Sequence, residues 1–219
     1  MAFTRHARHQ LAPFSLTYSL SVSFSIIDEF LCNSRQWNTR HVSVNDFISD
    51  ISSRVPVDER ERESITAFLR TAPGLADPFN EHADPVHVTA SAILVSDAGD
   101  KVALHLHKRL NMWLQPGGHI ETGESPADGA LREASEEIGV PVRHQEPGGL
   151  LMHLDVHPGP KGHTHLDLRY LVRGPEVTPQ PADGESTQVG WFGWAEAESM
   201  ADAGLVGALR AAKALLGLG

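Results

Sequence analysis

The strongest constraint on this chain is the stretch GGHIETGESPADGALREASEEIGV, residues 117–140. Ser125 can cap a helix, Pro126 suits the first helical position, and Gly139 can end the helix in the left-handed conformation. These signals predict a helix over about residues 126–138 between two glycine turns. One side of such a helix must be apolar and pack on a core.

The other side of the predicted helix is acidic. At about 100° per residue, Glu133, Glu136 and Glu137 form one stripe, almost opposite the apolar side chains. Like charges at these spacings repel by a few tenths of a kcal/mol per pair, roughly. Two interpretations stay open. Charge runs are usually solvated faces, but the stripe also suits Mg²⁺, a hard cation that prefers oxygen ligands.

The charge balance bears on the class of partner. The chain has 219 residues, with 18 Lys and Arg against 28 Asp and Glu, so its formal charge is −10. An acidic chain lacks the basic surface that non-specific nucleic-acid binding requires, so no nucleic-acid partner is expected. Such a chain can still bind a small anion if a metal ion supplies the positive charge.

Cysteine content and hydropathy bear on the compartment. Cys32 is the single cysteine, so neither an intramolecular disulfide nor a cysteine-based zinc site can form. A reducing, cytoplasmic location fits this usage. No run of about 18 apolar residues occurs, so no membrane span is expected.

Residues 1–42 differ from the rest of the chain. No acidic residue precedes Asp28, and basic residues precede a serine-laced apolar run, LAPFSLTYSLSVSFSII. One interpretation is a targeting segment, since such segments are basic and poor in acidic residues. The other is an extension that is disordered or stays outside the core.

Residues 43–84 show helical patterns followed by a linker, LADPFNEHADP. Asn45 or Asp46 is placed to cap a short helix that ends near Arg54, and Asp58 to cap a second helix. We expect this segment to form an N-terminal helical extension.

Residues 85–218 carry strand patterns and are expected to form the main domain. VHVTASAILVS is β-branched and apolar, DAGD is typical of a hairpin turn, and KVALHLHKR alternates. Further strands are expected in NMWLQPGGHIE, GGLLMHLDVH, HTHLDLRYLVR and QVGWFGWAEAESM, the last leading into a turn, and a closing helix in GLVGALRAAKALLG. Antiparallel hairpins with added helices predict an α+β fold.

The segment HLDVHPGPKGHTHLDLR predicts a second polar cluster. A symmetric turn at PGPKG would place its polar side chains on one sheet face: His157 opposite His163, Asp155 opposite His165, His153 opposite Asp167, and Arg169 beyond them. Three interpretations stay open for this face. It is solvated, or it is a groove in which His165, Asp167 and Arg169 contact substrate phosphate or ribose, or it binds a transition metal. His119, nearby in the sequence, is given no role.

The acidic stretch resembles the Nudix box, G-x5-E-x7-R-E-U-x-E-E-x-G-U, in which U is a bulky aliphatic residue. The fixed positions of the motif are occupied here by Gly118, Glu124, Arg132, Glu133, Glu136, Glu137, Gly139 and Val140. Ala134 departs from the pattern at the first aliphatic position, which is expected to weaken packing and leave the chemistry unaffected. The pattern W-x-x-P-G-G-x-x-E, from Trp113 to Glu121, is also similar to the family, and the resemblance covers about residues 86–216.

The resemblance implies a mixed or antiparallel sheet sandwiched between helices, and an activity. Nudix hydrolases cleave a nucleoside diphosphate linked to another moiety, so the implied partner is a small nucleotide diphosphate derivative. The implied cofactor is Mg²⁺, with Mn²⁺ as the alternative. Its implied ligands are Glu133, Glu136, Glu137 and the carbonyl of Gly118.

Further roles also follow from the resemblance. Arg132 resembles the arginine that orients the catalytic glutamates, and Glu124 resembles their supporting carboxylate. The general base is left open between Glu185, in the loop PADGESTQVGWF, and Glu133. Glu137 completes the implied catalytic set.

Two other functions share this fold. A catalytically silent Nudix domain would sense a ligand, but such domains usually lose box carboxylates, and all are present here. An isopentenyl-diphosphate isomerase would need a cysteine near the metal, and Cys32 lies outside the predicted fold. A homodimer is left open, as is the choice between ADP-ribose-like compounds and nucleoside triphosphates.

Overall fold

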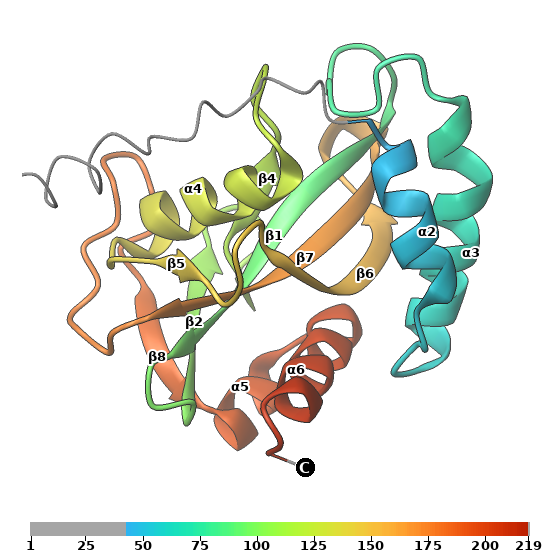
Figure 1. The fold of residues 1–219 in the computed structure, drawn as a ribbon. Coiled ribbons are helices and arrows are strands. Elements are labelled where there is room, and N and C mark those ends of the chain that lie inside the picture. Colours follow the sequence, from blue (N-terminus) through green and yellow to red (C-terminus); the bar gives the residue numbers. More distant parts are fainter. Residues whose placement is uncertain (1–42, 219) are drawn as a thin grey trace, which may run out of the picture. The chain divides into compact units, whose positions relative to one another are not determined.

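The structure is a computed structural model that describes residues 43–218. The expectations for residues 1–42 lie outside this range. Within it, a single mixed β-sheet carries helices on both faces (Figure 1), so the α+β fold expected from the sequence is confirmed. None of the described helices is long and apolar enough to span a membrane.

Eight strands form the sheet: β1 (Val86–Ser96), β2 (Lys101–His107), β3 (Met112–Leu114), β4 (Gly117–His119), β5 (Arg143–His144), β6 (Leu150–Pro158), β7 (Thr164–Gly174) and β8 (Val189–Gly193). The main path runs β3-β2-β1-β7-β5, with β4 paired to β1, β6 to β7 and β8 to β2. The expectation of antiparallel hairpins holds for most pairs. β1 and β7, however, are parallel along their whole length, because the chain makes a crossover between them that contains a helix.

The helices are α2 (Asn45–Ser53), α3 (Glu59–Thr71), α4 (Pro126–Ile138), α5 (Trp194–Met200) and α6 (Ala203–Leu215), with short 3-10 turns at Ala72–Gly74 and Pro160–Gly162. α5 lies where the sequence indicated only a turn. α4 occupies the predicted residues, with the Ser125 hydroxyl accepting from the backbone N–H of Asp128. Gly139 ends α4 at φ 70°, and an added Cβ there would lie 1.8 Å from the Gln180 carbonyl oxygen.

The N-terminal helices begin in different ways. Asp58 caps α3 as expected, accepting from the backbone N–H of Glu61. The predicted cap of α2 was wrong, because the N-cap position is Val44 and has no side-chain cap. Asp46 instead accepts from the backbone N–H of Ser43 at 2.8 Å.

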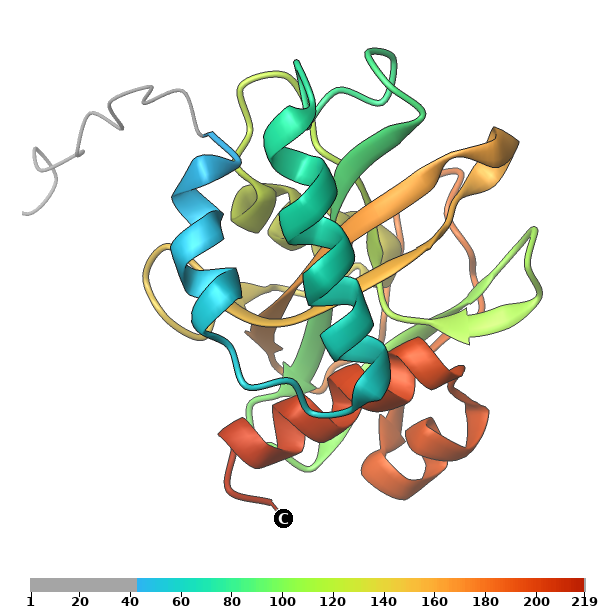
Figure 2. The same ribbon diagram turned by 90° about the vertical axis from the view of Figure 1, so that its right-hand side faces the viewer.

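The sheet separates two apolar cores. α4 packs on one face, and α5 and α6 pack on the other (Figures 1 and 2). Alternate residues of β1 divide between them: Ala90 and Ala92 join the α4 core, and Ile93 and Val95 join the α6 core. This alternation places the polar side chains of His87, Thr89 and Ser91 on the α6 face.

The helices α2 and α3 cover the edge strand β6. The Arg54 guanidinium donates to the carbonyl of Leu151 at 2.9 Å and also to that of Met152. The hydroxyl of Ser64 accepts from the backbone N–H of Val156 at 3.0 Å. An uncovered edge would leave these backbone groups free to pair with another chain, so the N-terminal extension protects the β6 edge of the sheet.

The register of the β6–β7 hairpin differs from the symmetric prediction by two residues. The observed pairs are His157 with His165, Asp155 with Asp167, and His153 with Arg169. The turn is centred one residue later than expected, with Lys161 in the left-handed region at φ 58° and the backbone N–H of Gly159 donating to the His163 carbonyl at 2.8 Å. A shift of two preserves the face of each side chain, so the polar residues still share one face.

Candidate active site

The box glutamates lie where α4 meets the short strand β4. Gly117 donates its backbone N–H to Glu137 Oε2 at 2.9 Å. At Gly118, an added Cβ would lie 2.5 Å from Glu133 Oε1. The absence of side chains at Gly117 and Gly118 therefore lets the helix bring two carboxylates directly against the strand backbone.

Arg132 holds the carboxylates in place. Its Nε and Nη2 donate to the two oxygens of Glu124 at 3.0 and 3.1 Å, and Nη1 donates to Glu133 at 2.9 Å and to Glu136 at 3.2 Å. Nη2 also donates to the His119 carbonyl at 2.9 Å. Burial opposes the charged form, but the hydrogen bonds to Glu124 and Glu133 raise the pKa of Arg132. One guanidinium thus links three carboxylates to β4.

The cluster holds more negative charge than Arg132 can balance. Glu137 is only 12% exposed. Burial raises its pKa to about 8, although the Gly117 N–H works in the opposite direction, and the charges of Glu133 and Glu185 add to the rise. Burial also raises the pKa of Glu133. Burial disfavours the ionised form of these carboxylates, and a hard divalent cation bound to their oxygens would stabilise that form.

The loop after β7 places Glu185 beside this cluster. The backbone N–H of Gln180 donates to the Gly139 carbonyl at 3.1 Å, and that of Ala182 donates to the Glu136 carbonyl at 2.8 Å. The charge of Glu185 is close enough to raise the pKa of both Glu133 and Glu137. Within residues 43–218, the Glu185 carboxylate makes no hydrogen bond or ion pair.

His105 was not identified from the sequence as part of this site. Its Nδ1 lies 3.6 Å from Glu137 Oε1. Burial lowers its pKa to about 4, with His107 contributing, so the ring is neutral at neutral pH. The alternation of β2 already placed His105 opposite the apolar face of that strand, but only the pairing of α4 with the sheet brings it to Glu137.

Comparison with known proteins covers the part of the chain that contains this site. The NUDIX domain model matches residues 85–211. The chain belongs to the Nudix family. Of the box positions, the divergent Ala134 is fully buried in the α4 core, so that departure affects packing and leaves the carboxylates in place.

Two curated Nudix relatives are similar over part of their length. One is 32% identical over 45% of this chain and 58% of its own length, the "Probable DHNTP pyrophosphohydrolase" of Lactococcus lactis. Another is 30% identical over 52% of this chain and 51% of its own, the "Nucleoside diphosphate-linked moiety X motif 6" protein of Xenopus laevis. The chain therefore spans only about half the length of the curated relatives it matches.

Solved Nudix structures show the same fold. A NUDIX-family hydrolase from Clostridium perfringens is 30% identical, with a TM-score of 0.51 over 59% of this chain and 97% of that one. The Ap4A hydrolase of C. elegans, in a binary complex, is 22% identical, with a TM-score of 0.51 over the same shares. The second likeness concerns the fold alone.

The polar face of the β6–β7 hairpin is buried in this Nudix domain, so the interpretation of a solvated face is wrong. Asp167 accepts from Ser91 at 2.8 Å, from Thr89 at 3.1 Å and from Arg169 Nε at 2.8 Å. Burial opposes ionisation of Asp167, but the charge of Arg169 lowers its pKa. The carboxylate is therefore ionised and fully paired.

The remaining nitrogens of Arg169 are also occupied. Nη1 donates to the Gly204 carbonyl of α6 at 2.7 Å, and Nη2 donates to Asp155 at 3.3 Å. Arg60 of α3 completes the network through Asp155 at 2.7 Å. Buried side chains with every polar atom paired are poor substrate ligands, so Asp167 and Arg169 act here as a structural network. Among the three expected substrate contacts, only His165 keeps a ring nitrogen unpaired.

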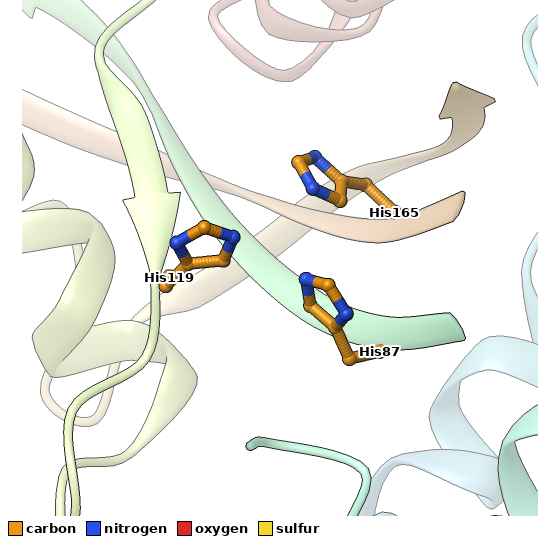
Figure 3. Close-up of side chains that lie close together, drawn as sticks. All are labelled: His87, His119 and His165. Atoms are coloured by element: carbon orange, nitrogen blue, oxygen red, sulfur yellow. The ribbon is translucent and has the colours of Figure 1, made fainter. Parts of the chain in front are cut away.

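His165 lies in a separate cluster on the same face. His87, His119 and His165 bring one ring nitrogen each within 4.8 Å of the others (Figure 3). The sequence placed His165 in a polar hairpin, but it gave no sign that His87 and His119 would join it. Their meeting depends on which strands are neighbours in the sheet.

Proposed function

We propose that this Nudix domain hydrolyses a nucleoside diphosphate linked to another moiety, with water attacking phosphorus. The observation that carries the proposal is the set of box carboxylates that Arg132 ties to β4, with Glu137 buried against the backbone of Gly117. The names of the two curated relatives, a pyrophosphohydrolase and a nucleoside diphosphate-linked moiety X protein, support the same reaction class.

A divalent cation fits the donors that the site presents. Glu133, Glu136 and Glu137 offer carboxylate oxygens, and Gly118 offers its carbonyl, which suits Mg²⁺ and also Mn²⁺. Burial raises the pKa of Glu133 and of Glu137, and the charges of neighbouring glutamates add to the rise; a bound cation would offset both effects. When bound, the ion would neutralise the diphosphate and lower the pKa of a water molecule.

Side chains of the protein orient the carboxylates and accept the proton of the attacking water. Arg132 keeps the carboxylates of Glu124, Glu133 and Glu136 in fixed orientations. Glu185 takes the proton from the attacking water, because its carboxylate is free of bonds within the described residues and lies beside the cluster. Glu133 is the competing base, but its Oε1 already accepts from Arg132.

The substrate within this class is an ADP-ribose-like compound or a nucleoside triphosphate, as the sequence left open. The acidic charge of −10 favours a small-molecule partner over nucleic acid. A cytoplasmic location is part of the proposal and rests on the use of a single cysteine, and a homodimer stays open.

A substrate panel tests the proposal directly. Nucleoside diphosphate derivatives and triphosphates are incubated with the full chain and Mg²⁺ or Mn²⁺, and phosphate-bearing products are quantified. Glu137→Gln should lower the rate by about 10²–10³, because a group that stabilises charge in the transition state is lost. Glu196→Gln, an exposed helical glutamate of α5, is the matched control and should keep the parent rate.

Two results would count against hydrolysis. An unchanged rate in Glu137→Gln would remove the box from the catalytic machinery. A parent that binds nucleotides but turns over none of the panel would favour a ligand-sensing domain instead.

A further inference from the structure

Five histidines gather at the end of the sheet where β1 begins. Each ring centroid lies within 5.5 Å of at least one other, and the five are His87, His119, His157, His163 and His165. None is assigned a task in the proposed hydrolysis. A surface that merely solvates polar groups has no need to stack imidazoles in partly buried positions.

Strand pairing brings the central three together. His87 lies directly opposite His165 on the parallel strands β1 and β7. His119, the last residue of β4, lies opposite Thr89, two residues along β1 from His87 and on the same face. Figure 3 shows the three rings, each from a different strand, directed toward a common point. Backbone positions held by a sheet make this a rigid arrangement.

The nitrogens that converge are without partners. Nε2 of His87, of His119 and of His165 is buried and makes no hydrogen bond within the described residues. A buried polar atom without a hydrogen-bond partner is destabilising, so three of them at one point require an explanation. A shared ligand would satisfy all three at once.

The opposite ring nitrogens are held from outside the cluster. His87 Nδ1 lies 3.2 Å from the Asp84 carbonyl, and His119 Nδ1 lies 3.5 Å from a carboxylate oxygen of Glu81. Outer partners of this kind fix the tautomer in which Nδ1 carries the proton and the Nε2 lone pair faces inward. They are the second layer usually found behind histidines that ligate a metal.

We propose that His87, His119 and His165 bind a transition-metal ion, Zn²⁺ by preference, at a site separate from the glutamate cluster. Neutral imidazole suits Zn²⁺ and its neighbours, whereas Mg²⁺ prefers oxygen. Burial lowers the pKa of His87 and of His165, that of His165 to about 4. These two rings are therefore neutral at neutral pH and need not lose a proton to bind.

The geometry leaves room for a fourth ligand. Zn²⁺ binds imidazole nitrogens at about 2.0–2.1 Å in a tetrahedron, which places the nitrogens roughly 3.3 Å apart. The three ring nitrogens lie within 4.8 Å of one another, and small rotations of the rings would bring them to the separation that Zn²⁺ requires. Three protein ligands leave one position for water or for the neighbouring ring of His163.

Such an ion would clamp β4 to β1 and β7. His119 follows Gly117 and Gly118, which contact Glu137 and Glu133, and its own carbonyl accepts from Arg132. A metal on the His119 ring would therefore hold the strand on which the glutamate cluster rests. Its first measurable effect is stabilisation of the fold.

The test measures metal binding, so it does not depend on hydrolysis. The full chain is stripped with a chelator, saturated with Mg²⁺, and titrated with Zn²⁺ by calorimetry and with Co²⁺ by visible absorption. We expect one equivalent of Zn²⁺ despite the Mg²⁺, the d–d bands of nitrogen-ligated Co²⁺, and a higher melting temperature with Zn²⁺.

Histidine variants locate the site. His87→Gln and His165→Gln should each weaken Zn²⁺ binding by at least about tenfold, because each removes a direct ligand and loss of even an outer partner costs that much. His82→Gln removes a histidine whose side chain is 84% exposed and should bind as the parent does.

A glycine variant blocks the site without removing a ligand. A Cβ added at Gly159 would lie 2.4 Å from His165 Nε2, while its backbone, at φ −97° and ψ −179°, suits alanine. Gly159→Ala should therefore lose Zn²⁺ affinity and keep the metal-free melting temperature. Parent affinity in Gly159→Ala and in both histidine variants would overturn the site. So would a parent protein that shows no Co²⁺ d–d absorption, even if every variant fails to fold.

Discussion

Gly117 and Glu137, twenty residues apart in the chain, are joined by a 2.9 Å hydrogen bond from the glycine N–H to Glu137 Oε2. The bond connects β4 to the last turn of α4 and holds the carboxylate where it is almost fully buried. On its other side, Glu137 Oε1 faces the neutral ring of His105 at 3.6 Å. This setting makes Glu137 the most informative residue of the site.

The buried Glu137 predicts that the metal-free protein loses stability as pH rises from 6.5 to 8. Its pKa is about 8 in the folded protein, against about 4.3 when unfolded. In that window the folded state binds the extra proton, so the free energy of unfolding falls by up to about 2 kcal/mol. Saturating Mg²⁺ should reduce the loss, and Glu137→Gln should remove it. Urea unfolding at the two pH values measures it, and identical slopes for parent and variant would contradict the assignment.

Acid should destabilise the protein through its buried histidines. Burial lowers the pKa of His105 and His165 to about 4 and that of His153 to about 3. Below pH 6.5 the unfolded state binds protons that the folded state excludes, so stability falls toward pH 4. Glu137 opposes this trend, because in this pH range the folded state holds one proton on Glu137 that the unfolded state releases.

His153→Gln isolates one contribution to the acid sensitivity. His153 is 1% exposed, and its removal should lower the slope of unfolding free energy against pH by about 1.4 kcal/mol per pH unit between pH 4.5 and 6. Urea titrations of parent and variant across that range give the slope. An unchanged slope would show that His153 is accessible to protons in the folded state.

Exchange of single carboxylates identifies the general base. Glu185→Gln should lower kcat by about 10²–10⁴ and remove the acidic limb of the pH–rate profile, while KM changes little. Glu133→Gln should instead weaken Mg²⁺ binding, so that a higher Mg²⁺ concentration is needed for half-maximal activity, because this residue is proposed as a metal ligand. If Glu133→Gln alone abolishes the acidic limb, the base belongs to the helix and the loop assignment is wrong.

The buried ion network predicts unequal effects for two arginines that share Asp155. Arg169→Met should cost about 3–5 kcal/mol of stability, because Asp167 and Asp155 would stay buried with a partner missing. Arg60→Met should cost less, since the Arg60 side chain is 41% exposed. Chemical denaturation of both variants measures the difference. Arg169 is 3% exposed. Equal losses of stability would mean that burial of the arginine does not determine how much its ion pairs contribute.

The sequence by itself determined α4 and the residues on it. The Ser125 cap, Pro126, the apolar period and Gly139 all act within one helix, so local rules placed its bounds and put Glu133 and Glu137 on one stripe. Strand patterns likewise located β1 and β7, because alternation and β-branching are local properties. The short β5 and helix α5 escaped prediction, since neither carries a pattern long enough to read.

Only the tertiary structure decided which strands are neighbours. The parallel pairing of β1 with β7 joins segments separated by more than seventy residues, and no local signal encodes it. That pairing brings His87 to His165, and the antiparallel β4 adds His119. The same packing buries Arg169 under α6, where the sequence alone left it as a candidate for solvent or substrate. Contacts across the sheet depend on the sum of many long-range interactions, whereas a helix cap depends on a single turn of backbone.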